Sequence, residues 1–214
     1  MIKRLLWGLC LLLTTMSANA QTLRKVDAAQ QKSMVEKINR TAASIRSIDC
    51  SFTQVKTLQF LNDKMTSQGR MLFVAEGAKL RWEYQTPYSY TFILNGQKVF
   101  IHSQKNTQTI DISQSRLFQS IAEVMLNSVT GKSLSTNADF VCTMMTQGDD
   151  WVADLVPKKK ELKKMFKSIR LYFGSKQQMV TRVEMTEQNG DTTMITLKDV
   201  KTNGRVDEKM FAAR

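Results

Sequence analysis

Residues 92–101 read Phe92-Ile93-Leu94-Asn95-Gly96-Gln97-Lys98-Val99-Phe100-Ile101. The Asn-Gly pair between two apolar runs favours a tight hairpin turn, because such a turn needs positive φ at its central residues. The segment therefore predicts two antiparallel strands, at residues 90–95 and 98–103. This is the clearest local signal in the chain, and we assign the other strands outward from it.

Segments in which apolar and polar residues alternate lie on both sides of this hairpin, as expected for strands with one buried face. Turn-type pieces at residues 76–78, 147–150 and 188–191 separate some of them. Sequential hairpins of this kind make a sheet antiparallel. Besides the hairpin, we expect strands at residues 50–60, 66–75, 79–85, 107–112, 138–147, 150–156, 166–174, 178–187 and 191–200.

Two segments repeat apolar residues at three- and four-residue steps, which is typical of amphipathic helices. The first, residues 26–48, precedes the strands, and the second, residues 115–128, interrupts them midway and ends at Gly131. About eleven strands are too many for a strongly twisted open sheet, which curls or splits beyond about ten. We therefore expect a mainly β fold with some α: an incomplete antiparallel barrel with the helices on its concave side.

The first twenty residues have the pattern of a secretory signal peptide. Lys3 and Arg4 precede an apolar run, and Ala18 and Ala20 precede the expected cleavage site. The run is shorter than the about 20 apolar residues that span a bilayer core. We expect residues 1–20 to be removed and residues 21–214 to form a single soluble domain outside the cytoplasm.

The chain is strongly basic, with a formal net charge of +12, of which +10 remains without the two basic residues of the signal segment. A basic surface attracts anionic partners over long range. For an exported protein these are lipid headgroups, acidic proteins or glycans before nucleic acid. A solvated basic face that only aids solubility is the alternative.

Cys50 and Cys142 are the two cysteines that follow the signal segment. An exported protein can form disulfides, but a bridge requires Cα atoms within about 7 Å of each other. The sequence leaves two alternatives open: a Cys50–Cys142 disulfide, or two buried free thiols.

Groups for catalysis are few in this sequence. The single histidine, His102, lies in a predicted strand, and the cysteines do not have the close spacing of zinc ligands. Gly131-Lys132-Ser133 resembles the end of a phosphate-binding loop, but Leu126 stands where that loop requires glycine. We predict a protein that is not an enzyme and holds no metal or cofactor; an envelope enzyme with an unrecognised carboxylate site is the alternative.

Several motifs, in their order and spacing, resemble the outer-membrane lipoprotein carrier family, LolA. The central ones are Gln68-Gly69-Arg70-Met71-Leu72-Phe73-Val74, Lys79-Leu80-Arg81-Trp82-Glu83-Tyr84, Pro87 and Asn95-Gly96-Gln97-Lys98-Val99. Ser51-Phe52-Thr53-Gln54 lies upstream, and Leu155-Val156-Pro157 and residues 203–211 lie downstream. The resemblance therefore covers nearly all of the chain after the signal segment.

The resemblance implies an unclosed antiparallel β-barrel with a helical lid over an apolar cavity. It also implies a soluble periplasmic carrier that moves acylated lipoproteins from the inner to the outer membrane without a cofactor. The expected partners are an inner-membrane release complex, an outer-membrane acceptor and, transiently, the membrane; we expect a monomer. Related folds serve as lipid-binding sensors and glycolipid carriers, which remain the alternatives.

By strand alternation, Leu80, Trp82 and Tyr84 share one face, and similarity to the family implies that this face lines the cavity. Further lining residues are expected from the neighbouring strands, with an ordinary packed core as the alternative: Phe52, Phe73, Phe92 and Leu94. The lid would present Leu117, Phe118, Ile121 and Met125. Well-known family members have an arginine in the loop before residue 80 that is thought to hold the lid closed; Glu76 stands there in this chain.

Overall fold

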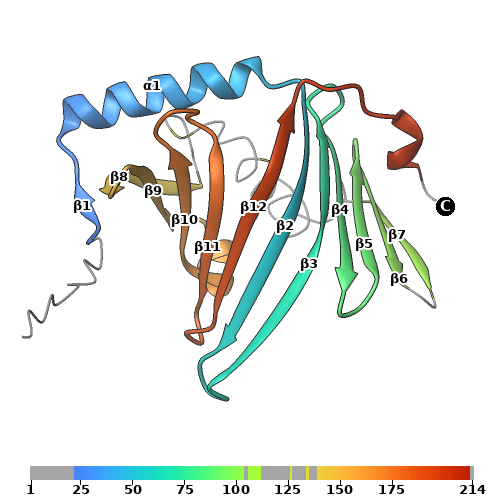
Figure 1. Ribbon diagram of the computed structural model, residues 1–214. Coiled ribbons are helices and arrows are strands. Elements are labelled where there is room, and N and C mark those ends of the chain that lie inside the picture. The colour runs from blue at the N-terminus through green and yellow to red at the C-terminus, as the bar shows by residue number, and fades with distance from the viewer. Residues whose placement is uncertain (1–21, 104–105, 112–125, 127–133, 135–138, 213–214) are drawn as a thin grey trace, which may run out of the picture.

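The computed structural model describes residues 22–103, 106–111, 126, 134 and 139–212. Within these ranges the protein is mainly β, with one twelve-stranded antiparallel sheet in the order β1-β8-β9-β10-β11-β12-β2-β3-β4-β5-β6-β7. The sheet is curved, and its two edges, β1 and β7, do not pair with each other (Figure 1). The prediction of an unclosed antiparallel sheet is confirmed.

The first half of the chain contains β1 (Arg24–Lys25), α1 (Ala28–Ser44), β2 (Ser47–Leu58), β3 (Asp63–Val74), β4 (Lys79–Thr86), β5 (Tyr90–Asn95), β6 (Lys98–Ser103) and β7 (Thr107–Asp111). The second half contains β8 (Phe140–Gln147), β9 (Asp150–Pro157), α3 (Lys160–Met165), β10 (Phe166–Gly174), β11 (Val180–Glu187), β12 (Thr192–Thr202) and the 3-10 helix η2 (Glu208–Phe211).

All eleven predicted strands are present, and the hairpin strands β5 and β6 have the predicted bounds. The additional strand is β1, which has two residues and pairs with β8. The six-residue helix α3 was not predicted, because so short a helix shows no clear apolar period. The predicted helix at residues 115–128 lies outside the described residues.

Helix α1 is shorter than the predicted helix over residues 26–48. It begins after Asp27, whose carboxylate accepts a hydrogen bond from the backbone N–H of Gln30 at 2.8 Å. It ends at Ser44, because the chain then enters the sheet at Ser47. Ile45 and Ile48 continue the apolar spacing and are buried, but outside the helix, so the predicted end was wrong.

The pairing of β2 with β12 joins the two halves of the chain. In the order of the sheet, β3 to β7 lie beyond β2, and β11 to β8 and then β1 lie beyond β12. The two strands lie side by side in the middle of the curved sheet (Figure 1). We call this pairing the seam.

Strand alternation gives the sheet two distinct faces. The inner face shares one apolar core with Val35 and Ile38 of α1, which crosses one end of the sheet (Figure 1). On the outer face, Leu72 and Ile93 pack against Phe211 of η2. No helix in the described part of the chain is long and apolar enough to cross a membrane.

Asn203 fastens one end of the seam. Its side-chain oxygen accepts a hydrogen bond from the backbone N–H of Arg46 at 2.7 Å, and its side-chain nitrogen donates one to the carbonyl of Ser44 at 3.1 Å. Its backbone N–H donates to the carbonyl of Ser47 at 3.0 Å. These bonds fix the point where the chain leaves α1 and enters β2.

We expect Asn203→Ala to lower the free energy of unfolding by about 2 kcal/mol, because it removes two hydrogen bonds of about 1 kcal/mol each. Asn62→Ala is the matched control, since both asparagines have positive φ, 59° and 47°, but Asn62 lies in an exposed turn. Urea denaturation of both variants measures the difference. Equal destabilisation would show that the side-chain bonds of Asn203 contribute nothing.

Candidate functional site

The seven side chains predicted to line a cavity come together on the inner face. Cross-strand partners connect them: Phe73 is opposite Leu80, Leu80 is opposite Leu94, and Trp82 is opposite Phe92. Tyr84 and Phe52 are both opposite Gly69, on the two sides of β3. Tyr84 and Phe92 are half-buried, and the other five are buried.

Three aromatic rings form the centre of this group. The rings of Phe52 and Trp82 have centroids 4.5 Å apart, and the ring of Tyr84 meets that of Phe52 edge-on at 5.2 Å. The Tyr84 hydroxyl donates a hydrogen bond to the side-chain oxygen of Gln54 at 2.9 Å. Burial raises the pKa of this hydroxyl above its usual value, so it stays protonated and neutral around neutral pH.

Gly69 makes this aromatic packing possible. A Cβ atom at this position would lie 1.9 Å from the carbonyl oxygen of Glu83 and 2.7 Å from the Phe52 ring. Only a residue without a side chain lets the ring of Phe52 lie against β3. The glycine of the Gln68-Gly69-Arg70 motif is therefore required by packing of the aromatic group.

We expect Gly69→Ala to destabilise the fold by about 3 kcal/mol, because the added methyl group must displace the Phe52 ring or the β4 backbone. Gly204→Ala is the control, since a Cβ there meets nothing within 4 Å. Thermal unfolding compares the two variants. A Gly69→Ala protein as stable as the control would contradict the close approach.

Trp82 supplies a polar atom to an otherwise apolar surface. Its indole N–H is buried and makes no well-aligned hydrogen bond among the described residues, although its interaction with the Tyr84 hydroxyl opposes the rise in the pKa of that hydroxyl. A buried donor without a partner is costly, and a carbonyl oxygen of a bound molecule would satisfy it. The inner face therefore combines apolar walls with the buried indole donor of Trp82.

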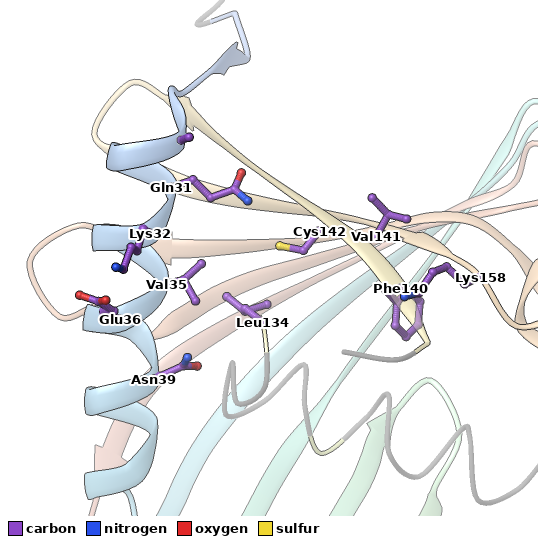
Figure 2. Close-up of a pocket in the computed structure, with 11 residues that line it drawn as sticks. Gln31, Lys32, Val35, Glu36, Asn39, Leu134, Phe140, Val141, Cys142 and Lys158 are labelled. Carbon is purple, nitrogen blue, oxygen red and sulfur yellow. The ribbon is translucent and has the colours of Figure 1, made fainter. Parts of the chain in front are cut away.

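A separate pocket of about 710 Å³ lies between α1 and β8. This volume is within the range of about 300–1,000 Å³ found for small-molecule sites. Figure 2 shows α1 on one side and β8 on the other, with Leu134 between them. Its described lining residues are Ala28, Gln31, Lys32, Val35, Glu36, Asn39, Leu134, Phe140, Val141, Cys142 and Lys158.

The pocket is lined by both apolar and polar side chains. Val35, Leu134 and Phe140 belong to the same core as the seven predicted residues, although none of those seven lines the pocket. Gln31 holds α1 to the sheet, since its side-chain oxygen accepts a hydrogen bond from the backbone N–H of Met144 at 3.1 Å. The pocket is thus an opening beside the main core.

Sequence reasoning missed this pocket. The signal that could have indicated it is the i, i+4 row of Gln31 and Val35, which puts a polar and an apolar side chain on one helix face. The helix pattern did not say which strand this face meets, and β8 lies more than a hundred residues further along the chain.

The resemblance also gave roles to four lid residues and to the loop that contains Glu76. The predicted lid residues Leu117, Phe118, Ile121 and Met125 lie outside the described residues. Glu76 lies in the turn between β3 and β4 with its side chain exposed. The structure therefore leaves the lid as a prediction.

A disulfide between Cys50 and Cys142 is not formed; both are free thiols. Cys50 is in β2 and Cys142 is in β8, and four strands lie between these two in the sheet. At about 4.8 Å per strand this separation exceeds the reach of a disulfide. Of the two alternatives that the sequence left open, the structure has the two free thiols, with Cys50 buried and Cys142 half-buried.

Both thiols should react slowly in the native protein. Burial raises the pKa of Cys50 to about 12 and that of Cys142 to about 11, and the carboxylates of Asp49 and Asp154 add to the respective shifts. Because the thiolate is the reactive form, alkylation at pH 8 should be at least about tenfold slower than in the unfolded chain. Mass spectrometry of the two cysteine peptides measures each rate; a peptide pair that stays cross-linked without reductant would contradict free thiols.

Within the part of the chain that the structure describes, no three His, Cys, Asp or Glu side chains gather in a way that could hold a metal ion. His102 has a structural contact, with its Nδ1 2.9 Å from the hydroxyl of Thr107 across β6 and β7. The chemistry available at the inner face is burial of apolar groups.

Comparisons with known proteins agree with the fold. A family model described as "Outer membrane lipoprotein carrier protein LolA" matches residues 43–214. The outer-membrane lipoprotein carrier protein of Pseudomonas aeruginosa is 27% identical over 184 residues, covering 86% of this chain and 84% of the relative. The same-named protein of Legionella pneumophila is 23% identical over 168 residues, covering 78% and 79%.

A solved structure supports the fold alone. An uncharacterised conserved protein from Thermus thermophilus aligns with a TM-score of 0.51 at 7% identity, covering 85% of this chain and 92% of that one. At such low identity, the shared feature is the architecture.

Proposed function

Because the chain belongs to the LolA family of outer-membrane lipoprotein carrier proteins, we propose that it carries lipoproteins from the inner to the outer membrane. In this proposal residues 1–20 are removed on export, and residues 21–214 act as one domain in the periplasm. An inner-membrane release complex hands over the lipoprotein, and an outer-membrane acceptor takes it.

The observation that carries this proposal is the apolar inner face of a sheet that does not close. In a closed, fully packed barrel, the interior would be filled by its own side chains. Here the inner-face core continues to the pocket between α1 and β8. Such an interior can be widened by separation of its walls, which is what reversible uptake of a long apolar chain requires.

The physical work of the carrier is to keep acyl chains from water. Each buried methylene contributes about 0.8 kcal/mol, so a free lipoprotein would not leave a membrane at a useful rate. We assign the wall of the site to the aromatic group around Trp82 and to its aliphatic neighbours. The residues are Phe52, Phe73, Leu80, Trp82, Tyr84, Phe92 and Leu94.

Trp82 has a further role in this proposal. Its indole N–H, which has no well-aligned partner among the described residues, would donate a hydrogen bond to an ester or amide carbonyl at the head of an acyl chain. That bond would orient the chain without a covalent step. Binding and release then involve no bond made or broken in the cargo.

The test uses two phenylalanines on adjacent strands that face opposite sides of the sheet. Phe92 is on the inner face, whereas Phe100 packs on the outer face near η2, and both are half-buried. We expect Phe92→Ser to lower lipoprotein capture at least about tenfold through lost apolar contact, while Phe100→Ser retains it. The measurement is release of a purified lipoprotein from membrane vesicles into a soluble complex.

Thermal unfolding of both variants separates loss of binding from loss of fold. If Phe92→Ser captures lipoprotein as well as Phe100→Ser at equal stability, the inner face is not the site. If the unaltered protein binds acyl chains but forms no soluble lipoprotein complex, a lipid sensor or a glycolipid carrier becomes the better description.

A further inference from the structure

The hairpin of β2 and β3 ends in an exposed apolar tip. Phe60 is 96% exposed and Leu61 is 65% exposed, and Met65 beside them is 51% exposed. Monomeric proteins bury large aromatic side chains where they can, so an almost fully exposed phenylalanine next to a leucine indicates a surface that meets an apolar partner. We call Phe60, Leu61 and Met65 the tip.

The backbone holds the tip outward. Gln59 to Asn62 form a turn in which the backbone N–H of Asn62 donates to the carbonyl of Gln59 at 3.4 Å, and Asn62 has φ 47°. Phe60 and Leu61 occupy the two central positions, where their side chains are exposed. The turn lies at the end of the two longest strands, each of twelve residues, and projects beyond its neighbours (Figure 1).

A lysine-rich segment lies at the same end of the molecule. Residues 158–167 carry six lysines and one glutamate, and all six lysine side chains are exposed. Lys159 pairs with Asp139 at 2.8 Å, and no other lysine of the segment has a carboxylate within 4 Å among the residues described. This segment includes α3 and the start of β10.

Strand register places the two features level with each other. Phe166 at the start of β10 is opposite Glu187, and Thr192 in β12 is opposite Thr57, next to the end of β2. β10 is three strands from β2, which corresponds to roughly 14 Å. The tip and the lysine-rich segment can therefore meet one surface together.

The turn between β11 and β12 makes hydrogen bonds to both the lysine-rich segment and the turn at the tip. Gln188 donates hydrogen bonds from its side chain to the carbonyls of Lys163, at 2.6 Å, and Phe166, at 3.1 Å. Asp191 accepts a hydrogen bond from the backbone N–H of Gln59 at 2.8 Å. The lysine-rich segment and the tip are thus connected through this turn and are not two independent loops.

We propose that this end of the molecule docks on an anionic lipid bilayer, with Phe60 and Leu61 inserted among the headgroups and the lysine-rich segment held over them. Apolar side chains flanked by cations match a bilayer surface, which offers acyl chains beneath phosphates. The exposed acidic residue next to the tip turn is Asp63, and the one within residues 158–167 is Glu161. The six lysines of that segment outnumber these two acids. This inference goes beyond cargo carriage and does not depend on it.

The experiment measures flotation of the purified protein with vesicles of phosphatidylcholine alone or with added phosphatidylglycerol. The unaltered protein should bind the anionic vesicles, more weakly at high salt. Phe60→Ser/Leu61→Ser should lower that affinity at least about tenfold, because it removes the inserted apolar groups. Lys163→Gln/Lys164→Gln/Lys167→Gln should lower it about tenfold or more, and only for anionic vesicles.

Controls lie at the other end of the sheet. Val200→Ser alters an exposed apolar residue, and Arg40→Gln/Arg46→Gln/Lys176→Gln removes the same charge as the lysine variant. Both should bind as the unaltered protein does. All the substituted side chains at the tip and in the lysine segment are exposed, so the variants should keep the fold.

A tryptophan at the tip tests insertion directly. Emission from a Phe60→Trp variant should shift to shorter wavelength on anionic vesicles and be quenched by brominated acyl chains, and that from Val200→Trp should not change. The proposal is overturned if the unaltered protein does not float with anionic vesicles or if the serine variant floats equally well. It is also overturned if the tip variant only abolishes self-association.

Failure of carriage is distinguishable from failure of docking. Phe92→Ser should bind empty anionic vesicles normally, since its side chain lies on the inner face. Loss of lipoprotein capture with docking intact would leave this proposal standing without the carrier function. The reverse result would remove the docking surface and leave the carrier function.

Discussion

The pairing of β2 with β12 is the interaction on which the rest of the structure depends. Among the described residues, and apart from the two-residue strand β1, which pairs with β8, it alone joins the strands formed by the first half of the chain to those formed by the second. Without it, each half would be a separate sheet with one open apolar face and too little area to cover it. The seam is fastened at one end by Asn203 and at the other by Asp191, so side chains from the C-terminal part of the chain hold both ends of this pairing.

Because the seam fixes the register, it also decides which side chains share the inner face. A shift of one residue would turn Trp82 outward and Arg81 inward, which would place a guanidinium group in an apolar core. Arg81 instead makes hydrogen bonds with Glu83 and with the carbonyl of Met210 near η2. The two faces are therefore specified by opposite requirements: apolar aromatic packing around Gly69 inside, and ionic pairing outside.

Local patterns predicted most of the sheet, since alternation and turn residues act within a few positions. The strands of the Asn95-Gly96 hairpin were predicted to the residue for this reason. The end of α1 was not predicted correctly, because the apolar spacing continues to Ile48. The side chain that hydrogen-bonds to the last helical residue, Ser44, is that of Asn203, which is far along the sequence. The α1–β8 pocket and the separation of Cys50 from Cys142 likewise depend on strand order, which one sequence does not contain.

The pocket and the lysine-rich segment are connected through Lys158. This residue lines the pocket between α1 and β8, and it is also the first of the six lysines in residues 158–167. If these lysines contact the phosphates of a bilayer, the part of the pocket's border that contains Lys158 would therefore lie close to the bilayer surface. An acyl chain that leaves the bilayer there has little water to cross, which lowers the cost set by each exposed methylene. Docking and carriage, although tested separately, would then share Lys158.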